Sequence, residues 1–61
     1  MNVFVEMVGG PHDGEVVTLS KTYAVVEFKM HVPGGDEVVR VRTYDRRPET
    51  LKYDYRGEVR P

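Results

Sequence analysis

The chain has 61 residues, no cysteine, and ten acidic against nine basic side chains, which gives a formal net charge of −1. This length allows one small domain, residues 1–61, near the lower limit for a core that folds unaided. The missing cysteines exclude a disulfide framework and a thiolate metal site, and the balanced charge excludes a strongly basic nucleic-acid-binding composition. No segment has the ~20 apolar residues of a membrane span, so we expect a cytoplasmic protein without a membrane partner.

Residues 3–8 and 15–19 alternate apolar and polar side chains, which predicts two strands. Between them lies the hexapeptide Gly9-Gly10-Pro11-His12-Asp13-Gly14. Glycine reaches positive φ angles, proline fixes its own φ, and an aspartate can bond the nearby backbone. The hexapeptide therefore predicts a tight reversal between strands, and we expect His12 and Asp13 to point apart and into solvent.

Three further strands are predicted by the same alternation, over residues 23–32, 38–44 and 51–59. The turn Pro33-Gly34-Gly35-Asp36 separates the first two, and Arg46-Arg47-Pro48-Glu49-Thr50 separates the last two. Because proline is tolerated at the first helical position, a short helical turn near 47–50 is an alternative there. The expected inward side chains are Ala24, Val26, Phe28, Met30 and Val32, then Val39, Val41 and Thr43, then Leu51, Tyr53, Tyr55 and Val59.

Five short strands with one apolar face each must bury those faces against one another. We therefore predict an all-β fold, a small five-stranded antiparallel sheet curled into an SH3-like or OB-like barrel. A homodimer that pairs two sheets is the alternative way to cover the apolar face. Only Ser20-Lys21-Thr22 joins the second and third strands, so we expect these two to meet at a corner or in a hairpin.

Two segments of the chain carry a resemblance to a known group. The Gly9–Gly14 hexapeptide, followed later by Tyr53-Asp54-Tyr55-Arg56-Gly57, resembles very short proteins of tailed bacteriophages and some actinobacteria. Those proteins carry Gly-Gly-Pro-x-Asp-Gly near the N-terminus and a tyrosine pair near the end. The resemblance implies a viral or prophage origin, and with it the cytoplasm of a bacterial host. It implies no catalytic residue, because the group has no agreed activity.

The two histidines carry little chemistry in this pattern. A base such as His12 needs a nucleophile or water within hydrogen-bond reach, and His12 with His31 lacks a third metal ligand. We therefore predict that the protein is not an enzyme and takes no metal or other cofactor.

The basic residues of the second half predict a binding surface. Its members are Arg40, Arg42, Tyr44, Arg46 and Arg47, with Lys29 on the same outer side of the third strand. Arginine beside exposed tyrosine is typical of protein interfaces, and small β-barrels hold single-stranded nucleic acid in the same way. Interspersed acids also fit a merely solvated face held by cross-strand ion pairs.

The function predicted from these observations is a small, non-enzymatic, phage-encoded protein that binds and occludes a host or viral protein. One alternative is a barrel that binds single-stranded nucleic acid through Arg40, Arg42, Tyr44, Arg46 and Arg47. The other is a structural or assembly component that works as an oligomer.

Overall fold

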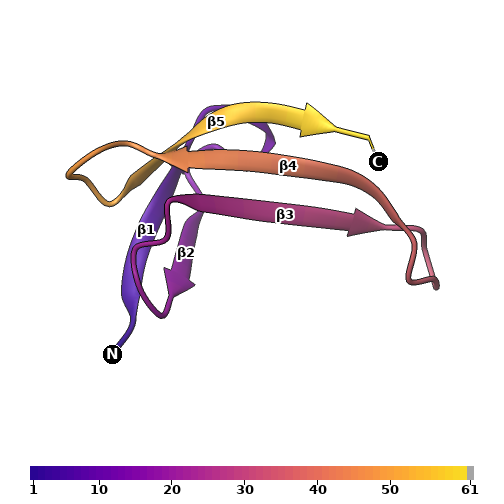
Figure 1. Ribbon diagram of the computed structural model, residues 1–61, viewed down its shortest axis with the longest axis horizontal. Coiled ribbons are helices and arrows are strands. Elements are labelled where there is room, and N and C mark those ends of the chain that lie inside the picture. The colour runs from indigo at the N-terminus through magenta and orange to yellow at the C-terminus, as the bar shows by residue number, and fades with distance from the viewer. Residues whose placement is uncertain (61) are drawn as a thin grey trace.

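The computed structural model describes residues 1–60, and nearly all of its regular structure is β (Figure 1). The strands confirm the predicted all-β fold with ends close to those expected. One short 3₁₀ turn, η1, lies between the first two strands. The helical turn given as an alternative near 47–50 is not present, and the chain forms an ordinary turn there. The elements are β1 (Val3–Val8), η1 (Gly10–His12), β2 (Val16–Leu19), β3 (Val25–His31), β4 (Val38–Arg46) and β5 (Lys52–Val59).

The five strands form one sheet in the order β2-β1-β5-β4-β3. Neighbouring strands are antiparallel except β1 and β5, which run parallel with Glu6 opposite Lys52 and Val8 opposite Asp54. The sheet is therefore mixed, whereas an antiparallel one was predicted. Alternation within a strand fixes its two faces, and it does not reveal that the first strand meets the last.

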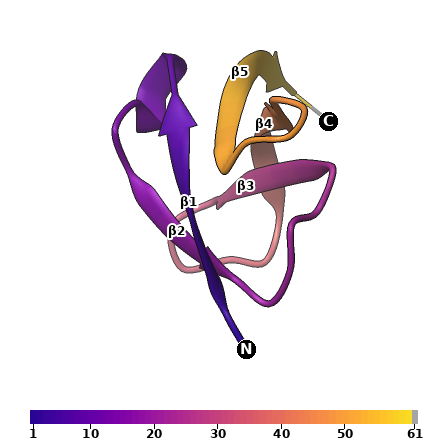
Figure 2. The same ribbon diagram turned by 90° about the vertical axis from the view of Figure 1, so that its left-hand side faces the viewer.

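The sheet curls into a half-barrel, as Figure 2 shows. Strands β2 and β3 lie at opposite edges, which in a flat sheet are about 19 Å apart. Only residues 20–24 join them, and they would have to be almost fully extended to span that gap. They are not extended, because the Tyr23 amide donates a 3.1 Å hydrogen bond to the Lys21 carbonyl. The connection is thus a corner that draws the two edges together, and not the alternative hairpin.

The core lies on the concave face of this half-barrel. Its buried members come from every strand except β2, and β2 adds partly buried side chains that pack against them. The Tyr53 hydroxyl donates to the Tyr23 carbonyl and so ties the 20–24 corner to the core; burial also raises the pKa of Tyr53. The buried residues are Val5, Met7, Val26, Tyr44 and Tyr53, and those packed around them are Val3, Val17, Leu19, Phe28 and Tyr55.

Strand β4 turns the opposite way from the prediction. Its pairing with β3 places Tyr44 opposite Val26 and Arg42 opposite Phe28, on the concave face. Tyr44 is completely buried, so the expectation that it lies outward with Arg40 and Arg42 is wrong. The valines of β4 occur in both registers, and its orientation is set by long-range pairing with bulges, at Met30/His31 and at Thr43/Tyr44.

No helix within residues 1–60 is long and apolar enough to cross a lipid bilayer.

Candidate functional site

The Gly9–Gly14 segment is the predicted tight reversal between β1 and β2. Gly9, Gly10 and Gly14 all have positive φ, at 80°, 63° and 84°, a region that side chains with a Cβ rarely enter. The Asp13 carboxylate accepts the Gly9 amide at 2.6 Å, and the Gly14 amide donates to the Met7 carbonyl at 2.8 Å. The glycine and aspartate positions of the hexapeptide are thus requirements of the turn itself.

The buried Tyr44 hydroxyl fastens this turn to the core. It accepts a hydrogen bond from the His12 amide at 2.9 Å and donates one to the Gly9 carbonyl at 2.8 Å. Gly10 lies on the ring of Tyr55, where a Cβ atom would sit only 2.6 and 2.7 Å from two ring carbons. The turn is therefore a fitted cap over the tyrosines of β4 and β5, which the sequence did not reveal.

The His12 side chain folds inward with this cap, contrary to the expectation that it points into solvent. Its ring stacks on Phe28, with 3.9 Å between ring centroids and 12° between planes. Nδ1 lies against the Glu15 carboxylate, and Nε2 is 3.5 Å from Nη1 of Arg42. With a proton on Nδ1 and a lone pair on Nε2, the ring can pair with both neighbours, so both of its nitrogens have partners within the chain.

Glu58 completes a chain of alternating charges on the concave face. Its carboxylate lies 3.1 Å from Nε of Arg42 and 4.0 Å from Nε of Arg40. Arg42 is the more buried of the two arginines. We call His12, Glu15, Phe28, Arg40, Arg42 and Glu58 the His12 cluster. Because its charges compensate one another, it is better suited to holding the cap in place than to binding an anion.

The predicted basic surface is not assembled in one place. Lys29 lies opposite Val41, on the convex face, while Arg40 and Arg42 belong to the concave face. Arg46 donates from Nε to the Thr50 carbonyl at 3.0 Å, within the β4–β5 turn. The prediction that Lys29 shares a side with these arginines is wrong, because one residue along a strand changes the face.

Arg47 is exposed, but it is engaged by an acid. It makes two hydrogen bonds to Asp54, of 3.0 and 2.6 Å. These bonds from the guanidinium lower the pKa of the Asp54 carboxyl, and the carboxylate raises the pKa of Arg47. A similar convex-face pair joins Arg56 to Asp45 at 3.2 Å. Such cross-strand pairs are the behaviour expected of a solvated β face.

The second histidine lies far along β3 in a different setting. His31 is exposed, and its Nδ1 is 3.2 Å from the Asp36 carbonyl in the following turn. Among residues 1–60, no three histidine, aspartate or glutamate side chains gather in a way that would hold a metal ion.

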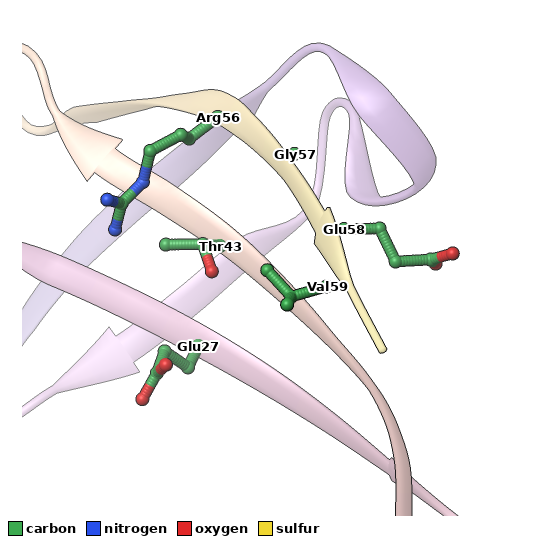
Figure 3. Close-up of a pocket in the computed structure, with 6 residues that line it drawn as sticks. All are labelled: Glu27, Thr43, Arg56, Gly57, Glu58 and Val59. Carbon is green, nitrogen blue, oxygen red and sulfur yellow. The ribbon is translucent and has the colours of Figure 1, made fainter. Parts of the chain in front are cut away.

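A shallow depression of about 410 Å³ opens on the convex face where the β4–β5 bulge leaves room (Figure 3). Gly57, which carries no side chain, lies opposite the buried Thr43. Glu27, Arg56 and Val59 stand around the opening. Within residues 1–60 no buried side-chain polar atom lacks a hydrogen-bond partner, so the depression contains no unpaired buried polar side-chain atom.

A larger groove of about 590 Å³ crosses the convex face of β2, β1 and the start of β5. Phe4, Val16 and Leu51 line it and are 66, 66 and 49% exposed. Leu51 is brought beside β1 by its carbonyl, which accepts the Glu6 amide at 2.9 Å. We call this the Phe4 groove; it is lined by Phe4, Val5, Glu6, Val16, Arg47, Thr50, Leu51 and Lys52.

The sequence held one signal for the Phe4 groove. Phe4 stands in the polar register of β1, between the inward Val3 and Val5, where alternation alone calls for a hydrophilic side chain. A large apolar residue out of register is informative because it lies where burial within the chain does not explain it.

Comparisons of the chain with protein-family models, with curated proteins and with solved structures found no match.

Proposed function

We propose that this chain is a non-enzymatic protein-binding module that uses the Phe4 groove to hold a partner protein. The observation that carries the proposal is the groove itself, in which three large apolar side chains are at least 49% exposed side by side. Scattered apolar residues on a surface need no explanation, but a contiguous apolar groove is typical of interaction sites.

The charges at the rim of the groove indicate which kind of partner would fit it. Lys52 brings one positive charge and Glu6 one negative charge to the groove, and Lys52 makes no salt bridge within residues 1–60. Arg47 also lines the groove, but its charge is paired with that of Asp54. A segment that inserts an apolar side chain between Phe4 and Leu51 and carries an acid beside it would match both the floor and the rim. The resemblance to short phage proteins favours a host or viral protein as the source of that segment. Binding would occlude the partner's own surface.

The nucleic-acid alternative receives less support from the geometry. It requires a strip of unpaired arginines with exposed tyrosines, whereas Arg40, Arg42, Arg47 and Arg56 each lie within 4.0 Å of a carboxylate. Tyr44, the aromatic residue expected at the centre of that strip, is enclosed in the core.

The test is a selection from a displayed library of random peptides, followed by nuclear magnetic resonance titration of the winners. We expect acidic peptides with an aromatic or aliphatic anchor, and shifts at the amides of Phe4, Val16 and Leu51. Leu51→Lys should weaken binding by about 10-fold or more, since burying a leucine contributes about 1.5–3 kcal/mol.

Val59→Lys is the matched control. Val59 was expected to lie inward, but it is 60% exposed, against 49% for Leu51, and it lies beside the other depression. It should bind the selected peptides as the wild type does. Peptides whose shifts map elsewhere, or an equal loss in both variants, would show that the groove is not the binding site.

A further inference from the structure

The long free edge of the sheet offers a second surface, separate from the Phe4 groove. Strand β3 is the terminal strand of the sheet and pairs, within residues 1–60, only with β4. It is seven residues long, against four for β2 at the opposite edge. Figure 1 shows the C-terminal end of β3, at the arrowhead, standing clear of β1 and β2. A strand of this length with one free edge can pair with a further strand along that edge.

The hydrogen-bonding pattern shows which residues face that edge. Arg46 donates to the Ala24 carbonyl, and Val32 donates to the Glu37 carbonyl, both at 2.9 Å. In an antiparallel ladder, alternate residues direct both backbone groups to the same neighbour. Even-numbered residues of β3 therefore bond to β4. The backbone groups of Val25, Glu27, Lys29 and His31 point to the free edge.

The side chains along this edge are complementary to a second copy of themselves. Glu27 and Lys29 are both exposed on the convex face, and neither makes a salt bridge in the described part of the chain. In an antiparallel pair of β3 strands centred on Phe28, each Glu27 stands opposite the partner's Lys29. The neighbouring symmetric registers instead put Glu27 opposite Glu27, or Lys29 opposite Lys29, which is unfavourable.

The concave face fits the same register. Centring on Phe28 places the two Phe28 side chains opposite each other, and Val26 opposite the partner's Met30. Met30 is one of the exposed large apolar side chains, and it would be covered. These are the closely spaced pairs of an antiparallel ladder, where side-chain contact is strongest.

We propose that two copies of this chain associate through their β3 edges, in the register that faces Glu27 with Lys29, to form one ten-stranded sheet. The contact is isologous, because the same strand is used twice about a two-fold axis. Lysine on an edge strand ordinarily discourages pairing with another edge. Here Glu27 lies two residues before Lys29, so each Lys29 can pair with the Glu27 of a second copy. The two Phe4 grooves stay open, since they lie on the β2–β1–β5 side of the sheet.

The experiment measures self-association by sedimentation velocity from about 1 to about 500 µM, because an interface this small should have a dissociation constant in the micromolar range. Glu27→Lys and Lys29→Glu each create two like-charge pairs and should weaken the dimer at least about 10-fold. An equimolar mixture of the two variants restores both attractive pairs and should dimerise as strongly as the wild type. Glu37→Lys, an exposed reversal outside the strand, is the control and should dimerise normally.

Hydrogen exchange of the wild-type chain tests the same β3–β3 interface without any substitution. The amides of Glu27 and Lys29 should become protected as concentration rises, while those of Val26 and Phe28 are protected throughout by β4. A chain that stays monomeric over the whole range overturns the proposal. A dimer that tolerates both single reversals, or whose mixed variants fail to associate, overturns the register and with it the interface.

Discussion

The hydroxyl of Tyr44 offers the sharpest test of how the cap is held. Tyr44→Phe keeps the ring and the volume of the core and removes one oxygen atom. That oxygen joins the His12 amide to the Gly9 carbonyl through bonds of 2.9 and 2.8 Å. Two hydrogen bonds are lost, and two backbone groups near the core lose their partner. With about 0.5–1.5 kcal/mol for each bond, we expect a loss of about 1–3 kcal/mol in the free energy of unfolding.

This loss is large for so small a domain. A chain of this size has a total stability of about 3–9 kcal/mol, and each kcal/mol moves its melting temperature by about 4–8 °C. We therefore expect Tyr44→Phe to melt about 4–24 °C below the wild type by circular dichroism, and to unfold at a lower urea concentration. The amides of Gly9 and His12 should also exchange faster with solvent.

Tyr23→Phe is the matched control. Its hydroxyl bonds only to the exposed Ser20 side chain, at 2.9 Å, so its removal should change stability by less than about 0.5 kcal/mol. If Tyr44→Phe is as mild as Tyr23→Phe, the buried hydroxyl does not hold the cap, and the account of the hexapeptide as a fitted turn is refuted.

The remaining predictions concern the cap and one surface ion pair. Gly10→Ala should cost about 1–3 kcal/mol more than Gly14→Ala, since both have positive φ but only the Cβ at Gly10 meets a tyrosine ring; equal urea midpoints would contradict this. Arg47→Gln should raise the pKa of Asp54 toward its ordinary value, which a carboxyl carbon titration by nuclear magnetic resonance measures. Because folding lowers this pKa, the pair stabilises the fold above the ordinary aspartate pKa. This contribution is lost as pH falls through the pKa that Asp54 has in the folded protein. Arg47→Gln should therefore lose less stability on acidification than the wild type does. An unchanged Asp54 titration would contradict the pairing.

The sequence carried enough information to predict the strands and the position of the turns. Residues 3–8 were predicted as a strand although Phe4 and Val8 depart from the alternation, and β1 has those bounds. The Gly9–Gly14 segment was predicted as a reversal on the basis of glycine, proline and aspartate alone, and it is one. Local rules suffice in these cases because both features depend on neighbours in the chain.

The features that were missed depend on contacts between distant parts of the chain. Tyr44 lies inward because β4 pairs with β3 in one register, and no local pattern distinguishes that register from its neighbour. His12 is held by Phe28 and Arg42, which follow it by 16 and 30 positions. At the β4–β5 turn, Glu49 has a φ of 61° where glycine is the usual residue, so even the local rule had an exception there.

The central position of β5 sets the order in which the molecule can be completed. This strand pairs with β1 on one side and β4 on the other, and Glu6 meets Lys52, 46 positions further along. During translation, the β1–β2 and β3–β4 hairpins therefore cannot join into one sheet until residues 52–59 have left the ribosome. Until then each hairpin is a separate unit of marginal stability. Such distant pairing slows folding, so we expect the nascent chain to remain open to proteases and chaperones until β5 has been made.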